Sequence, residues 1–200
     1  REIYGAGWNL IKLYFMIGLP EEKEQDLQEL IELAGKVAAL GKKKRKKNVL
    51  NVSVAAFVPK AHTPFMWEPQ IACEESRRRI GKIRDGLKST HIKVKWNQPE
   101  LSWLEGIFSR GDRRLTAPLI LESKYGARYD AWGEHFDMAL WQKCFKECNI
   151  DPSDYLYRRR AFDETLPWGH ISSGVSTEYL MREREKAVDS IMTPDCREKC

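Results

Sequence analysis

The sequence has no long hydrophobic run. None of its apolar stretches approaches the ~20 residues that a helix needs to cross a membrane, and residues 1–7 lack the basic-then-apolar layout of a secretory signal. The five cysteines are an odd number, which favours reduced thiols over a disulfide framework. We therefore expect a cytoplasmic protein without a membrane partner.

The composition is that of a folded globular protein. Hydrophobic residues make up 42% of the 200 residues and aromatic residues 10%, enough for a packed core in one large domain or two small ones. No internal repeat is visible. The composition alone leaves the oligomeric state undetermined.

The positive charge is concentrated in one run, Lys42–Lys47. The run holds six positive charges and the whole chain sums to +5, so the remainder has a net charge of −1. A solvated loop is the favoured interpretation. The alternative is a nucleic-acid-binding module that contacts RNA phosphates with this run, helped by Arg77–Arg79 and Arg158–Arg160. No aromatic residue interleaves with the run, which weakens the case for single-strand binding.

Two short apolar runs, Lys12–Ile17 and Val49–Phe57, stop at Gly18 and at Pro59. Each is too short for a helix and has the pattern of a strand buried on both faces. Between them, apolar residues at helical spacing predict a helix over 24–40. This β-α-β unit predicts a parallel sheet, whose ligands bind where the strands end.

The rest of the chain predicts mainly helices. The spacing indicates a helix over 70–89, a strand over 92–96, and helices over 100–109 and 118–125. An aromatic-rich helix from Trp132 to a C-terminus near Asn149, a short helix opened by Asp151, and a final helix over 176–190 follow. Most tryptophans are expected to build a small core.

Two of these segments carry a family resemblance. The loop Ile17-Gly-Leu-Pro-Glu-Glu22 resembles the glycine loop after the fifth barrel strand of radical S-adenosylmethionine (SAM) enzymes, and Phe57-Val-Pro-Lys-Ala-His-Thr-Pro64 resembles their sixth-strand segment. The chain is most similar to a group of cobalamin-binding-domain-containing radical SAM proteins of poorly defined function. Its C-terminal part shares with that group the motifs Ser-Arg-Gly-Asp-Arg-Arg (109–114), Leu-Pro-Trp (166–168) and Thr-Pro-Asp-Cys-Arg (193–197).

The resemblance implies a fold and a function. The fold class would be α/β: the C-terminal half of a TIM-like β/α barrel over residues 1–115, followed by an α-helical extension over 116–200. The parent enzyme would cleave SAM reductively to a 5′-deoxyadenosyl radical. The residues expected beside SAM are Ile17, Gly18, Leu19, Pro20, Glu22, Phe57, Val58 and Pro59.

Radical SAM chemistry requires a Cys-x3-Cys-x2-Cys triplet that holds a [4Fe-4S] cluster, and the sequence contains no such triplet. We therefore expect this chain to be a fragment whose partner is the missing N-terminal half of the same polypeptide. The fragment alone is expected to be inactive and to bind no cofactor. SAM and the cluster would belong to the parent, for which cobalamin is a further candidate.

Lys60 and His62 follow the second strand and are candidates for substrate or anion contact. Lys60 could meet a carboxylate or phosphate. His62 could act as a general acid or base, because the reference pKa of histidine is near ~6.5. A turn histidine held by neighbouring backbone is the alternative, and radical chemistry does not need a catalytic histidine.

Arg110, Arg113 and Arg114 are a second candidate for anion contact, with Asp112 placed to orient one of them. The alternative is a helix C-terminus in which Gly111 is the left-handed residue. The sequence leaves both interpretations open.

The cysteines predict no complete metal site. Cys73 is expected to be buried and inert, and Cys144 and Cys148 lie four apart on one helical face, where packing is favoured over metal binding. Cys196 and Cys200 could be part of an auxiliary cluster or zinc site in the parent, but they cannot complete one here.

Overall fold

The computed structural model describes residues 1–42, 49–89, 91–195 and 197, without the side chain of Lys42. The basic run and the cysteines Cys196 and Cys200 therefore lie outside the described side chains. Two compact units are present: residues 1–57 with 71–102, and residues 58–70 with the described residues from 103 onward. The two domains expected from the sequence, 1–115 and 116–200, remain a prediction.

The first unit is built on a parallel sheet of three strands: β1 (Leu10–Ile17), β2 (Val49–Ala56) and β3 (Ile92–Trp96). The strand order is β1-β2-β3, so each strand pairs with its predecessor in the chain. In the register, Ile17 lies opposite Ala56 and Leu50 opposite Ile92. The predicted α/β class and all three strands are confirmed.

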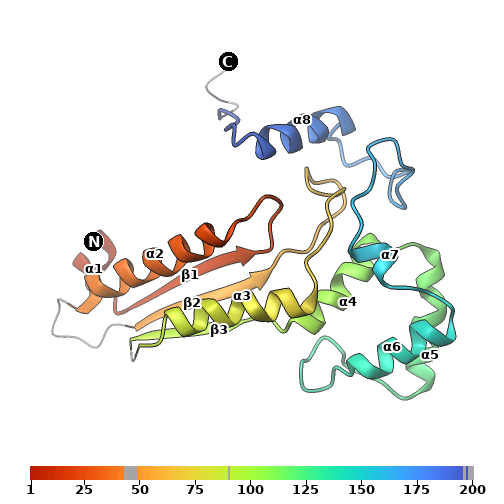
Figure 1. Ribbon diagram of the computed structural model, residues 1–200, viewed down its shortest axis with the longest axis horizontal. Coiled ribbons are helices and arrows are strands. Elements are labelled where there is room, and N and C mark those ends of the chain that lie inside the picture. The colour runs from red at the N-terminus through yellow and green to blue at the C-terminus, as the bar shows by residue number, and fades with distance from the viewer. Residues whose placement is uncertain (43–48, 90, 196, 198–200) are drawn as a thin grey trace. The chain divides into compact units, whose positions relative to one another are not determined.

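Two helices, α2 (Glu24–Lys42) and α3 (Cys73–Gly86), cover the same face of this sheet (Figure 1). Their apolar side chains pack with alternate residues of β2, because successive strand residues point to opposite faces. The buried core of the unit consists of Ile17, Leu27, Ala34, Ala38, Leu50, Val52, Val54, Ile80, Ile83 and Leu87. A single turn, α1 (Glu2–Gly5), precedes β1 and buries Tyr4.

The expectation that both faces of the strands are buried is wrong for β1. Residues 10–16 alternate between exposed and half-buried, with Tyr14 74% exposed, and only Ile17 of this strand is buried. The residues of β2 alternate between half-buried and buried. In the described part of the chain, one face of the sheet is packed and the other is open along β1.

Ion pairs link α3 to the start of α2. Arg78 contacts Glu24 and Glu75, and Lys82 Nζ lies 2.6 Å from Glu24. Hydrogen bonds from Arg78, and then Arg79, lower the pKa of Glu75 to about 2. Exposed pairs of this kind contribute little individually, so the apolar face supplies most of the packing energy.

The second unit is helical. After α4 (Pro99–Arg110), which begins in the first unit, come the 3-10 helix η1 (Arg113–Leu115) and α5 (Thr116–Lys124), and then α6 (Met138–Glu147), α7 (Ser153–Leu156) and α8 (Thr177–Val188). None of the helices in the described ranges is long and apolar enough to span a membrane.

The aromatic helix begins later than predicted. Asp137 is its N-cap, because the Asp137 carboxylate accepts a hydrogen bond of 3.1 Å from the Leu140 N–H. Trp132 lies outside this helix and is 62% exposed. Trp141 and Phe145 are buried, and Trp103 packs edge-to-face on Phe145 with the ring centroids 5.8 Å apart.

A buried carboxylate joins distant segments of the second unit. Glu68 is 1% exposed and accepts from Arg159 Nε at 3.0 Å and from Arg184 Nε of α8 at 2.8 Å. Beside it, Met66, Trp67, Trp168 and Leu180 form an apolar cluster. The expectation that tryptophans build a core is confirmed for Trp103 and Trp141 and wrong for Trp132; Trp168, which could have been an exception in its turn, is buried as well.

A second buried carboxylate generates a pH prediction. Glu122 on α5 is 5% exposed, and Trp141 Nε1 donates to the neighbouring Asp130 at 2.7 Å. Burial, and then the hydrogen bond and charge of Asp130, raise the pKa of Glu122 from 4.5 to about 7. The folded state thus keeps a proton that the unfolded chain releases, so stability falls as pH rises from about 4.5 to about 7.

We expect Glu122→Gln to remove this loss, because an amide carries no charge at any of these pH values. Urea unfolding at pH 4.5, 6 and 7.5 should show the variant gaining stability relative to the original chain as pH rises. The control is Glu134→Gln, which replaces an exposed carboxylate of the same unit. Parallel pH profiles for Glu122→Gln and the original chain would contradict the assignment.

Candidate functional site

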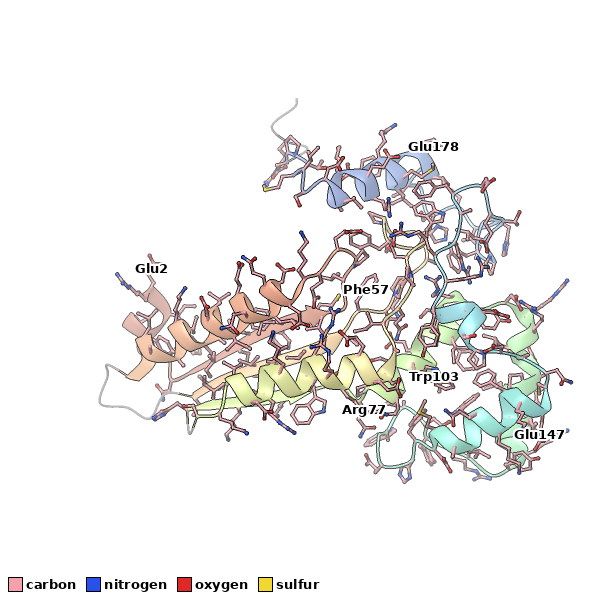
Figure 2. All side chains as sticks on the ribbon, viewed as in Figure 1. Glu2, Phe57, Arg77, Trp103, Glu147 and Glu178 are labelled. Atoms are coloured by element: carbon pink, nitrogen blue, oxygen red, sulfur yellow. The ribbon has the colours of Figure 1, made fainter. Side chains whose placement is uncertain are left out.

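The loops after β1 and β2 begin side by side at the carboxyl edge of the sheet. Ile17 pairs with Ala56, and the Phe57 N–H donates to the Ile17 carbonyl at 2.8 Å. Phe57, which directly follows β2 (Figure 2), is 7% exposed. The structure therefore brings together the ends of the two segments on which the family resemblance rests.

Gly18 occupies a position that requires glycine. Its φ of +81° lies in the left-handed region, and a Cβ atom there would lie 2.5 Å from Cδ1 of Ile71. The backbone can therefore come close to a neighbouring group at this edge only while the side chain is a hydrogen. Glu21 also has a positive φ, +64°, so the loop turns sharply twice within four residues.

The Glu22 carboxylate closes the loop. Its Oε2 accepts from the Gly18 N–H at 2.7 Å and from the Leu19 N–H at 3.2 Å, and its Oε1 lies 2.7 Å from Arg79 Nη1. The Glu22 side chain is only 6% exposed. Arg79 also pairs with Glu75 at 2.6 Å, so one guanidinium fixes the carboxylate that fixes the loop. The sequence-based prediction included Glu22 but missed Arg79 and Ile71, because neither lies in the motif.

The remaining residues of the loop differ in exposure. Leu19 is 37% exposed and Pro20 is half-buried. Val58 and Pro59 are buried and belong to the second unit. Of the predicted SAM contacts, only residues 17–22 and Phe57 lie in the first unit, so only their mutual geometry is described.

Gly18→Ala should lower the free energy of unfolding by about 1–3 kcal/mol, through the strained φ and the contact with Ile71. The matched control is Gly35→Ala in α2, where an added Cβ meets no atom within 4 Å; this change should stabilise by about 0.5–1 kcal/mol. Urea denaturation measures both. Equal effects of the two substitutions would show that Gly18 is not held as described.

The two candidates that follow β2, Lys60 and His62, lie in the second unit. Lys60 Nζ contacts the Glu105 carboxylate and donates to Ser109 Oγ at 3.0 Å. The prolines Pro59 and Pro64 on either side of residues 60–63 predict an extended loop, and this prediction is wrong: residues 61–67 form turns, and His62 has a φ of +55°. His62 is half-buried and lines a pocket of about 980 Å³ with Trp67, Trp168 and His170.

Arg110 holds the second unit together. It is fully buried, its Nε and Nη1 donate to the carbonyls of Tyr155 and Glu68, and its Nη2 donates to the Arg158 carbonyl at 3.2 Å. Burial, and then the charges of Arg160 and Arg158, lower its pKa to about 10. The donors predicted to contact an anion are thus already used on backbone carbonyls.

Arg113 and Arg114 lie at the surface, apart from buried Arg110. Asp112 orients Arg114, as the sequence suggested, with Nε–Oδ1 and Nη2–Oδ2 distances of 3.0 and 2.8 Å. Asp112 also caps η1. The alternative of Gly111 as a left-handed cap is wrong, because its φ is not positive. Glycine is needed there because a Cβ would lie 2.0 Å from Cδ1 of Leu115.

Arg110→Lys should destabilise the chain by about 2–4 kcal/mol, because one ammonium cannot reach all three carbonyls, which two separate segments hold in place. Arg113→Lys, an exposed substitution of the same kind, should change stability by less than about 0.5 kcal/mol. Thermal unfolding followed by circular dichroism tests both. Similar melting temperatures for the two variants would exclude the role given to Arg110.

The three cysteines that the structure describes are buried or half-buried. Cys73 is 5% exposed and donates to the Pro99 carbonyl at 3.4 Å, and burial raises its pKa to about 11. Cys144 is fully buried and Cys148 is half-buried. Within the described ranges, no group of three or more histidine, cysteine, aspartate or glutamate residues is arranged to hold a metal ion.

The arginines of the RNA-binding alternative are engaged within the chain. Arg77 pairs with Glu74 and Glu100, and Arg158 with Glu164 at 2.6 Å. Arg160 is 4% exposed and donates to the Arg110 carbonyl at 2.6 Å. Such pairs reduce the positive potential that a phosphate backbone would meet.

Comparison with known proteins gives one informative similarity. The chain is 36% identical over 110 residues to an uncharacterized protein of Methanocaldococcus jannaschii. The matched stretch covers 55% of this chain and 23% of that protein, so the chain spans about a quarter of its relative. No family model matches the chain. No solved structure matches it either.

Proposed function

We propose that this chain forms the C-terminal strands of the β/α barrel of a cytoplasmic radical SAM enzyme. The strand order supports this proposal. Three parallel strands in sequential order, with both connecting helices on one face, have the winding of a barrel; a doubly wound sheet would place helices on both faces. The strands would then belong to a TIM-like barrel.

The observation that carries the proposal is the contact between the two strand ends. The Phe57 N–H donates to the Ile17 carbonyl, which places the start of the glycine loop beside Phe57, the residue that directly follows β2. Ligands of parallel β/α folds bind at the carboxyl ends of the strands. The proposed contacts for the adenosine of SAM in the first unit are Ile17, Gly18, Leu19, Pro20, Glu22 and Phe57. Two further contacts predicted from the sequence, Val58 and Pro59, belong to the second unit.

The residues present fit adenosine at this edge. Gly18 is buried because Ile71 fills the space that a Cβ would occupy, and Glu22, held by Arg79, binds the Gly18 and Leu19 N–H groups, so the strand end is a fixed surface against which adenosine would lie. The chain's cysteines do not fit a [4Fe-4S] cluster, since they include no Cys-x3-Cys-x2-Cys triplet. The cluster, with SAM, would supply the radical chemistry from elsewhere in the parent polypeptide, while this chain orients the adenosine. If cobalamin is used, it would bind to another part of the parent polypeptide.

The test is binding of S-adenosylhomocysteine to the 200-residue chain, followed by amide shifts in two-dimensional NMR. We expect shifts at residues 17–22 and at Phe57, and at least a tenfold loss of affinity in Gly18→Ala. Gly35→Ala is the control and should bind as the original chain does. Shifts confined to the pocket beside Trp168, or equal binding by both variants, would overturn the proposal.

A complementary measurement uses the full-length polypeptide, purified without oxygen and supplied with iron, sulfide and a reductant. Formation of 5′-deoxyadenosine from SAM is expected, and Gly18→Ala should reduce it at least tenfold. Absence of the cysteine triplet from the full-length sequence would remove the enzyme assignment altogether.

A further inference from the structure

Two sequence motifs that the proposed function does not use line the same pocket of the second unit. They are the motifs 109–114 and 166–168, which about fifty residues of chain separate. The pocket has a volume of about 540 Å³, within the range of small-molecule sites. The residues that the two motifs contribute to its lining are Ser109, Gly111, Asp112, Arg113, Pro167 and Trp168. The fold therefore brings both motifs to one cavity.

This pocket continues into the pocket of about 980 Å³ that also contains His62. The residues that line both pockets are Asp112, Pro167, Trp168, His170 and Ile171. Two backbone hydrogen bonds fix the shared turn: the Gly169 N–H donates to the Leu166 carbonyl at 2.9 Å, and the Ile171 N–H donates to the Trp168 carbonyl at 3.0 Å. The two pockets join into one groove, which we call the motif groove.

Trp168 is a fixed apolar wall of the motif groove. Its side chain is buried, and the Arg160 guanidinium lies over the indole ring, 5.2 Å from the centroid. Arg160 is itself held in place, because its Nη2 donates to the Arg110 carbonyl at 2.6 Å. Ile171 and Phe108, also in the lining, are 55% and 39% exposed. Apolar groups of a ligand can therefore be buried here.

The smaller pocket carries a positive charge. Arg113 is exposed and forms no ion pair with another residue that the structure describes. The neighbouring Asp112 binds Arg114 instead, and its Oδ2 lies 2.8 Å from Arg114 Nη2. The guanidinium of Arg113 is therefore available to a ligand, and a guanidinium binds a carboxylate through two parallel hydrogen bonds.

The larger pocket is acidic. Asp163 and Glu178 line it, are exposed, and form no ion pair within the described ranges. A further carboxylate of the lining, Glu164, is already paired with Arg158 at 2.6 Å. The described residues that line this pocket include no lysine or arginine. A cleft lined by charges of one sign attracts the opposite charge, so this part of the groove favours an ammonium group.

We propose that the motif groove binds an amino acid or a short peptide whose two ends are free. Arg113 binds its carboxylate, and Asp163 and Glu178 bind its ammonium group. Its apolar side chains pack on Trp168 and Ile171. A nucleic acid would need several cations along the groove, and Arg113 is the only lysine or arginine among the described residues that line it. The inference does not rest on the proposed function, because the groove lies entirely in the second unit.

The experiment titrates leucine, and peptides of two to four alanine and leucine residues, into the 200-residue chain and follows backbone amides by NMR. We expect shifts at residues 109–113 and 163–171, with a Kd of about 1 mM for at least one length. Each peptide is also tested with its N-terminus acetylated or its C-terminus amidated. Either change removes one of the two charges and should weaken binding about fivefold, the scale of a solvent-exposed ion pair.

Two variants assign the ends of the ligand. In Arg113→Gln, amidation should weaken binding less than twofold, while acetylation should still weaken it about fivefold. In Asp163→Asn/Glu178→Gln, the two responses should be exchanged, because the ammonium group has lost its partners. All three positions are exposed, so the melting temperatures should stay close to that of the original chain.

The matched controls are Arg128→Gln and Glu134→Gln/Glu185→Gln, which remove the same charges at exposed positions of the second unit. Both should bind free, acetylated and amidated peptides as the original chain does. No binding of leucine or of any free peptide at 10 mM, equal effects of amidation in Arg113→Gln and Arg128→Gln, or tighter binding of a short RNA would overturn the inference. Loss of peptide binding would leave the SAM proposal intact, because that proposal is tested at residues 17–22.

Discussion

The pairing of β1 with β2 is the constraint on which the candidate site depends. Parallel register places Ile17 opposite Ala56, and one further hydrogen bond, from Phe57 to Ile17, extends the ladder beyond the strands. Two loops separated by almost forty residues of chain thereby start from one edge. A slip of one residue would reverse the faces of the whole strand, and would remove the alternation that buries Leu50, Val52 and Val54.

The loop itself is held by an electrostatic chain. Glu75 positions Arg79, Arg79 positions Glu22, and Glu22 binds the Gly18 and Leu19 amides. Burial strengthens such interactions because water is excluded. α3, which lies far along the sequence, therefore determines the geometry of the strand end. The same helix supplies apolar side chains to the core, so packing of the sheet and shape of the loop are coupled.

Much of the first unit could be predicted from the sequence, because short apolar runs and helical spacing are local signals. The strands 92–96 and 49–56 and the helices after them follow this pattern. The sequence could not indicate which side chains form hydrogen bonds or ion pairs with residues of distant segments. Arg110 resembled a surface anion ligand in its motif, yet the fold directs its donors to three carbonyls. The sequence predicts too early a start for α6, because aromatic residues at helical spacing also occur in the turns before its N-cap, Asp137.

The buried ion pairs of Glu68 affect how the second unit unfolds. Its buried charge is balanced by Arg159 and by Arg184, which lies on α8 more than a hundred residues away. Withdrawing α8 would leave a half-neutralised carboxylate among Trp67 and its apolar neighbours. Peeling this terminal helix is therefore coupled to loosening of the tryptophan cluster, and the helix behaves as a cooperative member of the unit and not as a detachable tail.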